Sequence, residues 1–260
     1  MNSAWSDPIL TCAEAKALEA RLFDGEEARE WPAMQQAGAA VGRAVLEDFK
    51  EIGGFPTAGR MLVLAGKGHN GGDALLAAKT ILEQHPAAQA TVLFVSGERA
   101  LRPLAWRAWR EVLRIAPGRV TKLPPKKGNP EGQGEYDLCL DGIFGFQFRP
   151  PVDAATAEVL RRVNVHPGIR LRAAVDLPSG VGGEAGDITF RADFTYATGS
   201  VKTPLLAERH RDVVGRLRYL DLGFFEVENN IAGAVDRVLK PSVLAPLAAL
   251  RAPQSDKRTF

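Results

Sequence analysis

Three short segments carry residue types that can do acid–base chemistry or bind a cation. The first is 69–73 (HNGGD), which places an imidazole, an amide and a carboxylate among glycines. The second begins at Asp141 (DGIFGFQFRPP), and the third is 176–180 (DLPSG). Amide, carboxylate and hydroxyl oxygens are hard donors suited to alkali or alkaline-earth cations, and a carboxylate can also transfer a proton.

The first segment lies in a glycine-rich loop between a predicted strand, 61–64, and a predicted helix that begins at Asp73. A strand, a glycine loop and a helix together bring bare backbone N–H groups up to an anionic ligand. The spacing is not G-x-G-x-x-G, and no Lys-Ser/Thr pair follows as in a Walker A loop. The alternative is a tight turn in which Asp73 caps the helix.

The other two segments have structural alternatives as well. Asp141 before a glycine can stabilise a turn, and Ser179 can bond its own backbone within a rigid turn. A ligand-binding site is favoured because the same arrangement occurs three times. Each of the three segments comes after an apolar run typical of a buried strand. In a parallel sheet these strand ends meet at one edge, where ligands bind.

Strand and helix patterns alternate along most of the chain, which predicts an α/β fold with a parallel, doubly wound sheet. A capping-box pattern at Thr11 and Glu14 begins the first helix. The predicted strands are 61–64, 90–95, 136–140, 171–175, 194–197 and 217–220, and the predicted helices are 11–23, 31–52, 73–83, 101–115 and 152–163. Loops are expected at 124–134 and in the tail, 253–260.

Bulk properties narrow the class of protein. The chain has 260 residues, of which 45% are hydrophobic and 25% are charged, as in an ordinary globular protein. Its net charge of +2 gives no indication of a nucleic-acid-binding patch. Its two cysteines, Cys12 and Cys139, suit a reducing compartment. No secretory signal and no apolar run of membrane-spanning length is visible, so we expect a cytoplasmic protein without membrane contact.

The three motifs together resemble the YjeF N-terminal domain family, the NAD(P)H-hydrate epimerases. The family patterns are roughly GxGNNGGDG, DALFGTG or DAIFGFS, and VDIPSG, where this chain has GKGHNGGDA, DGIFGFQ and VDLPSG. The resemblance covers about residues 9–225. It implies a Rossmann-like three-layer αβα fold with a mostly parallel central sheet. It also implies one domain over 1–260, without a fused dehydratase domain.

The resemblance further implies that the protein interconverts the R and S forms of hydrated NADH and NADPH, so that a separate dehydratase can restore the nucleotide. A potassium ion (K+) is then expected at Asn70, Asp141 and Ser179. The implied substrate-binding residues are His69, Asn70, Gly71, Gly72, Asp73, Gly145, Phe146, Gln147, Phe148, Arg149, Pro150, Pro151 and Asp176.

Epimerisation needs an acid and a base, and two carboxylates are the candidates. Asp176 is the first choice, because the end of an apolar strand favours a proton-carrying carboxyl group. Asp73 is the second, since capping its helix would occupy it. A homodimer is expected from the alanine-rich N-terminal helices with Trp5 and Trp31.

Three departures from the family pattern keep other functions open. His69 replaces an Asn, Ala74 replaces a Gly, and Gln35-Gln36-Ala37 stands where the family has Glu-Asn-Ala. The lost acidic group favours a non-catalytic nucleotide-binding or scaffold protein of the same fold. A nucleotide-dependent oxidoreductase is a third hypothesis, weakened because no acidic residue clearly ends the second strand.

Overall fold

A computed structural model describes residues 5–123, 134–182, 188–227 and 236–244. Residues 124–133 of the predicted loop at 124–134 lie outside these residues, as does the predicted tail at 253–260. The strands are β1 Ser6–Pro8, β2 Arg60–Ala65, β3 Gln89–Phe94, β4 Val120–Leu123, β5 Tyr136–Gly142, β6 Ile169–Val175, β7 Phe194–Thr198, β8 Arg216–Leu220 and β9 Arg237–Leu239. The α-helices are α1 Cys12–Phe23, α2 Glu27–Lys50, α3 His69–Gln84, α4 Pro103–Ile115, α5 Ala154–Val165, α6 Arg211–Val214 and α7 Phe224–Val227.

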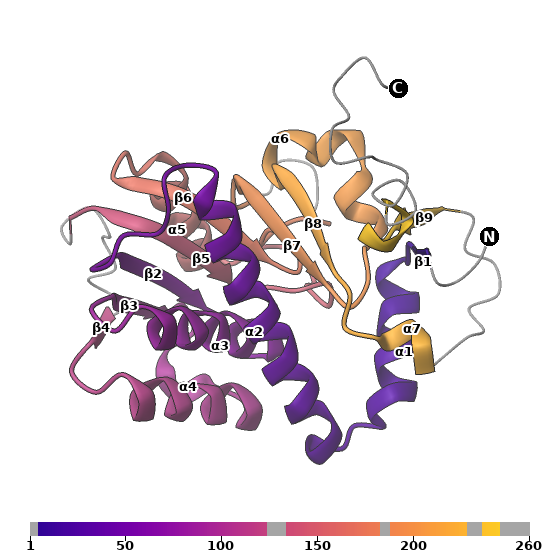
Figure 1. Cartoon of the computed structure of the whole chain (residues 1–260), viewed down its shortest axis with the longest axis horizontal. Coiled ribbons are helices and arrows are strands. Elements are labelled where there is room, and N and C mark those ends of the chain that lie inside the picture. Colours follow the sequence, from indigo (N-terminus) through magenta and orange to yellow (C-terminus); the bar gives the residue numbers. More distant parts are fainter. Residues whose placement is uncertain (1–4, 124–133, 183–187, 228–235, 245–260) are drawn as a thin grey trace, which may run out of the picture.

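The central sheet has seven strands in the order β4-β3-β2-β5-β6-β7-β8, and every neighbouring pair is parallel. Helices α2, α3 and α4 cover one face and α5 covers the other, which makes three layers (Figure 1). A small antiparallel pair, β1 with β9, lies beside α1 and α7 at one side of the molecule (Figure 1). The predicted α/β fold with a mostly parallel sheet is confirmed.

Alternating side chains of the strands supply two separate cores. In β2, Met61 and Val63 pack in the core beneath α2, α3 and α4. Their neighbours Leu62 and Leu64 pack in the core beneath α5. Both faces of the central strands are therefore buried, which explains why these strands are continuous apolar runs rather than alternating ones.

Helix α1 begins where the capping box predicts. Thr11 Oγ1 accepts from the Glu14 N–H at 3.2 Å, and Glu14 Oε2 accepts from the Thr11 N–H at 2.7 Å. Just before it, Leu10 pairs with Lys202 in an isolated parallel bridge. The bridge anchors the start of α1 to the segment that follows β7.

Helix α2 begins at Glu27 rather than at the predicted residue 31, and it ends at Lys50. It crosses α3 closely because two of its residues have no side chain. A Cβ atom at Gly38 would lie 2.4 Å from the Leu76 Cβ, and one at Gly42 would lie 2.8 Å from the Ala77 carbonyl oxygen. This close crossing fixes α3, whose first turn carries the HNGGD segment.

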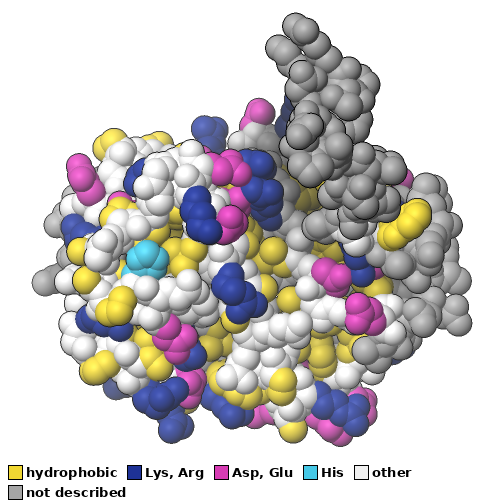
Figure 2. Space-filling view, in the orientation of Figure 1, with side chains coloured by type: hydrophobic (Ala, Val, Ile, Leu, Met, Phe, Trp, Pro, Cys, Tyr) yellow, Lys and Arg dark blue, Asp and Glu magenta, His cyan; other side chains and the backbone are white. Residues whose placement is uncertain are grey.

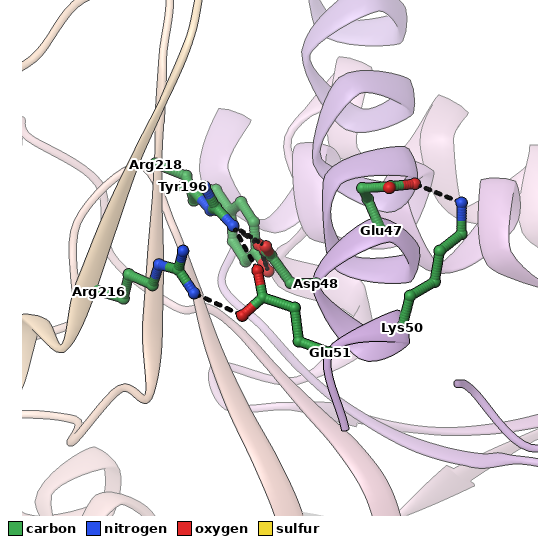
Figure 3. Close-up of polar contacts among 7 residues, drawn as sticks. All are labelled: Glu47, Asp48, Lys50, Glu51, Tyr196, Arg216 and Arg218. Atoms are coloured by element: carbon green, nitrogen blue, oxygen red, sulfur yellow. Dashed lines mark hydrogen bonds and ion pairs between the residues drawn. The ribbon is translucent and has the colours of Figure 1, made fainter. Parts of the chain in front are cut away.

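The C-terminal end of α2 is tied to β7 and β8 by a network of charged groups (Figure 3). Asp48 is 3% exposed, accepts from the Tyr196 hydroxyl at 3.0 Å and forms an ion pair with Arg218. Glu51 pairs with Arg216 at 2.6 Å nearer the surface. Burial and the neighbouring Asp48 carboxylate both raise the pKa of Tyr196. The network orients α2 across the sheet.

Three short strands, β1, β4 and β9, were not predicted from the sequence. β1 and β9 have three residues each and β4 has four, so a period of two cannot be recognised in them. Among the described residues, no helix is both long and apolar enough to cross a membrane. Basic and acidic side chains are interspersed on the face shown in Figure 2.

Candidate functional site

The three motif-bearing loops lie at one edge of the sheet, as predicted. They follow β2, β5 and β6, which are adjacent and parallel. From β2 the chain moves to β3 on one side, and from β5 it moves to β6 on the other. The boundary between β2 and β5 is thus a topological switch point, where open α/β sheets bind ligands. The Gly66 N–H donates to the Gly142 carbonyl across it at 3.0 Å.

Most glycines of the first loop are needed for internal packing. A Cβ at Gly66 would lie 1.9 Å from the Ile143 carbonyl oxygen, and one at Gly71 would lie 2.1 Å from the Gly66 carbonyl oxygen. A Cβ at Gly72 would lie 2.8 Å from the Met34 sulfur. Only Gly68 of the four has open space beside it. Gly68 is therefore the glycine of this loop at which an anionic ligand could approach the backbone closely.

Helix α3 begins earlier than predicted, at His69, with Gly68 as its N-cap. The first N–H groups of the helix, from His69 to Gly71, have no intrahelical acceptor and form an anion-binding end. Asp73 lies in the second turn, so the prediction that it caps the helix is wrong. The helix begins five residues before Ala74, the first strong helix former of the segment, which propensity alone does not predict.

Asp141 and Ser179 join the second loop to the third. Asp141 is fully buried, and its carboxylate accepts from the Ser179 N–H at 2.7 Å, the Ser179 Oγ at 2.7 Å and the Ile143 N–H at 3.2 Å. Ser179 Oγ accepts in turn from the Phe144 N–H at 2.9 Å. Burial raises the pKa of Asp141 to about 6, although the three donated bonds lower it. Asp141 lies within β5, one residue before its end, rather than just after it.

Asn70 has a buried polar atom that no described residue satisfies. Its Nδ2 donates to the Phe144 carbonyl at 2.8 Å, but its buried Oδ1 has no hydrogen-bond partner among the described residues. A buried carbonyl oxygen without a partner is costly, so a cation or a donor belongs there. The amide, carboxylate and hydroxyl oxygens of Asn70, Asp141 and Ser179 are of the chemical type that a hard monovalent cation prefers. The described residues contain no cluster of three or more His, Cys, Asp and Glu side chains able to hold a metal.

Asp176 has a partner that the sequence analysis did not assign. It is 5% exposed and forms an ion pair with Lys202, which is 1% exposed and also donates to the Thr198 carbonyl at 3.0 Å. The Asp176 carboxylate is thus held against the segment that follows β7. Asp176 also has φ of 66°, a left-handed conformation that is strained for a residue other than glycine.

The carboxyl group of Asp73 lies in different surroundings from that of Asp176. Its Oδ1 is buried and has no hydrogen-bond partner among the described residues. Burial, followed by the charges of Asp176 and Glu19, raises the pKa of Asp73 well above its ordinary range, and Lys202 opposes the rise. Two carboxyl groups in such different surroundings suit opposite roles in proton transfer.

Glu19 on α1 belongs to the same cluster of charges. Burial raises its pKa to about 7, Lys202 lowers it, and the charges of Asp176 and Glu30 raise it further. The thiol of Cys12 also has a raised pKa, from burial and then from Asp176, with Lys202 opposing. Sequence reasoning missed Glu19 because an isolated acid on a helix carries no local signal.

The second loop closes around Asp176. A Cβ at Gly145 would lie 3.5 Å from the Asn70 Cγ and 3.6 Å from the Asp176 Oδ2, which are ordinary van der Waals distances, so Gly145 lies directly beside both residues. Phe146 is partly buried, with the Lys202 Nζ 5.3 Å from its ring centre, and the Phe144 and Phe148 rings stack at 4.6 Å. The remaining predicted members of the loop are exposed, namely Gln147, Arg149, Pro150 and Pro151.

The three sequence departures lie in different surroundings. Ala74 is fully buried, and its methyl group stands where a side chain at Gly142 would be. His69 has its Nε2 3.3 Å from Glu30 Oε2, so a carboxylate of α2 reaches the first loop. Gln36 is exposed, with its Nε2 3.4 Å from the Leu222 carbonyl oxygen.

Sequence comparison assigns the fold and site to a family. The model described as "YjeF-related protein N-terminus" matches residues 32–204. The chain is 34% identical over 232 residues to the Bifunctional NAD(P)H-hydrate repair enzyme Nnr of Gloeobacter violaceus, covering 88% of this chain and 42% of that protein. It is 28% identical over 220 residues to the NAD(P)H-hydrate epimerase of Limosilactobacillus fermentum, covering 83% of this chain and 97% of that protein. The chain therefore belongs to the YjeF-related protein N-terminus family, which confirms the resemblance.

Two further facts define the relationship. The chain spans less than half the length of the bifunctional relatives from Gloeobacter violaceus and Thermosynechococcus vestitus, 42% and 47% respectively. The crystal structure of yeast ynu0 superimposes with a TM-score of 0.65 at 18% identity, covering 89% of this chain and 99% of that one. That structure shares the fold.

Proposed function

We propose that this protein interconverts the R and S forms of hydrated NADH and NADPH. The observation that carries the proposal is the convergence of Asn70, Asp141 and Asp176 at the edge where β2, β5 and β6 end. Support comes from the names of relatives, including the NAD(P)H-hydrate epimerase of Limosilactobacillus fermentum, of which the chain covers 97%. The diphosphate would bind at the N-terminus of α3 beside Gly68.

We propose that a potassium ion is held by Asn70, Asp141 and Ser179. The buried Asn70 Oδ1 without a partner supports this set, and Asp141 supplies its only formal charge. Such an ion would add positive charge beside the diphosphate of a bound nucleotide.

The proposed reaction breaks and remakes one C–O bond at a carbon that also bears a ring nitrogen. A proton donated to the hydroxyl group releases water and leaves an iminium-like cation, and water then adds to the opposite face while a base takes its proton. Asp73, whose buried Oδ1 has no partner among the described residues, is the proposed acid, and Asp176, paired with Lys202, is the proposed base. Reversing the reaction exchanges the two roles. The other predicted loop residues would contact the nucleotide.

Two isosteric variants test this proposal against hydrated NADPH. Asp176→Asn and Asp73→Asn should each lower the epimerisation rate by about 10²–10⁴-fold, because each removes one proton-transfer step. Hydrated NADPH should still bind to both, as measured by calorimetry. Near-normal rates in Asp176→Asn would remove it from the mechanism. No epimerisation by the unaltered protein would favour the scaffold hypothesis, for which the loss of one acidic group in the segment Gln35-Gln36-Ala37 is the argument.

We further propose a separate dehydratase as the partner that uses the S form, and a cytoplasmic location, which the two free cysteines support. A homodimer is also proposed. Trp31 is buried within the chain under the Arg107 guanidinium, 4.1 Å from its ring centre, so of the two tryptophans on which the prediction rested Trp5 is the exposed one. A mass of 28 kDa by light scattering at tens of micromolar would contradict the dimer.

A further inference from the structure

The loop that follows β3 lies directly beside the glycine-rich loop that follows β2. Ala65, the last residue of β2, pairs with Phe94, the last residue of β3. Beyond that pair, the Arg102 N–H donates to the Lys67 carbonyl at 2.8 Å, so the two loops are joined one residue before Gly68. The loop after β3 therefore flanks the end of α3 at which the diphosphate is proposed to bind.

The order of the strands indicates which part of the nucleotide this loop would meet. The glycine-rich loop follows β2, and β3 is its neighbour on the side away from β5. Doubly wound sheets that bind dinucleotides have the same order, with the diphosphate on the loop of the first strand and the adenosine ribose at the end of the second. An acidic residue there bonds a ribose 2′-hydroxyl group, whereas a nearby arginine accommodates a 2′-phosphate.

The acidic residue of this loop, Glu98, already has two partners. Its carboxylate accepts from the Trp109 indole N–H at 2.8 Å and from the Lys122 Nζ at 2.8 Å. Lys122 belongs to β4, which lies on the side of β3 away from β2. Glu98 is therefore held toward β4 and is not placed to bond a ribose hydroxyl group beside α3.

The basic residues of the two adjacent loops are free by comparison. Lys67, Arg99 and Arg102 are all exposed, and none of them forms an ion pair with a residue that the structure describes. Arg99 lies in the short 3-10 helix Glu98–Ala100, and Arg102 is the N-cap of α4. Three cations thus surround the position that the strand order assigns to the ribose, and the nearest acid of the loop is occupied elsewhere.

We propose that Arg99 and Arg102, together with Lys67, bind the 2′-phosphate of hydrated NADPH, so that the protein prefers this substrate to hydrated NADH. The inference rests on the proposed epimerase function and names its preferred substrate. A phosphate monoester carries about 1.5 to 2 negative charges at neutral pH, and guanidinium groups bind its oxygens in pairs. Hydrated NADH offers only a hydroxyl group at the same position, which gains little from cations.

The activity test measures kcat/KM for both hydrates in three proteins. These are the unaltered protein, the double variant Arg99→Gln/Arg102→Gln, and Arg110→Gln, an exposed arginine about two turns further along α4. The unaltered protein should prefer hydrated NADPH by about tenfold or more, the size of one charge-assisted hydrogen bond. In the double variant kcat/KM for hydrated NADPH should fall about tenfold more than for hydrated NADH, mainly through KM. Arg110→Gln should keep the preference of the unaltered protein.

A binding test reads the phosphate site without any reaction. Adenosine 2′,5′-bisphosphate and adenosine 3′,5′-bisphosphate have the same charge and differ in the position of one phosphate. In calorimetry at constant ionic strength, the 2′,5′ isomer should bind the unaltered protein about tenfold more tightly than the 3′,5′ isomer. The double variant should bind both equally, whereas Arg110→Gln should still distinguish them.

The outcomes separate this inference from the proposed function. If the unaltered protein converts neither hydrate but distinguishes the two bisphosphates through Arg99 and Arg102, the epimerase function is wrong and the phosphate site stands. If it converts both hydrates with equal kcat/KM, or if the double variant loses activity equally toward both, the inference fails and the function stands. Equal binding of the two bisphosphates by the unaltered protein also overturns the inference.

Discussion

Glu19→Gln should make the protein more stable at alkaline pH and leave its stability unchanged at acid pH. Folding raises the pKa of Glu19 from 4.5 to about 7, so the folded protein holds a proton there that the unfolded chain has lost. Stability falls with rising pH wherever the folded state binds more protons than the unfolded state. The loss therefore begins near pH 4.5 and is complete above about pH 7.

The size of the effect follows from the two pKa values. Each pH unit between them costs about 1.36 kcal/mol, so the ionised Glu19 costs at most about 3 kcal/mol. Glutamine has the same shape and never ionises, so the variant avoids this cost. For a chain of this length we expect its Tm at pH 8.5 to exceed that of the unaltered protein by about 5 °C.

Thermal unfolding followed by circular dichroism between pH 4.5 and pH 8.5 measures the effect, in buffers of matched ionic strength. The Tm difference should grow with pH over this interval and level off near pH 8. A difference that is constant across the range, or a variant that is less stable at pH 8.5, would refute the burial of Glu19 among the acidic groups of this cluster.

Three other perturbations test the surrounding structure. Lys202→Met leaves the Asp176 charge buried and unpaired and should cost about 3–5 kcal/mol in urea unfolding, with part recovered when Asp176→Asn is added. Asp141→Asn should abolish the rise in Tm that K+ gives the unaltered protein over an equal concentration of tetramethylammonium; an equal rise in both proteins would contradict the proposed ligand set. Asp48→Asn should cost about 2–3 kcal/mol by loosening α2 from β7 and β8, against less than about 0.5 kcal/mol for the exposed control Glu47→Gln; equal costs would contradict the network.

The sequence predicted most of the fold because its central strands and helices are long and periodic. Strands of six or seven residues, such as β2 and β5, were recognised within two residues of their ends. The sheet edge that carries the site followed from parallel topology alone. Strands of three or four residues lack a readable period and were missed.

The sequence could not predict which groups the fold brings against the candidate carboxylates. Lys202 follows β7, and only tertiary packing shows that it pairs with Asp176. Glu19 lies more than 150 residues before Asp176 in the chain, and the bridge of Leu10 to Lys202 holds the start of its helix beside the partner of Asp176. The sequence therefore identified the candidate carboxylates, whereas the partners that surround them in the fold could be found only from the structure.

The central claim is that the edge formed by β2, β5 and β6 interconverts the two forms of a hydrated nicotinamide nucleotide. The direct measurement is to incubate pure R-hydrated NADPH with the protein in potassium-containing buffer and to separate the two forms by chromatography over time. We expect the S form to appear at a rate proportional to protein concentration, and pure S-hydrate to reach the same final ratio. Formation of the S form no faster than in protein-free buffer would contradict the account.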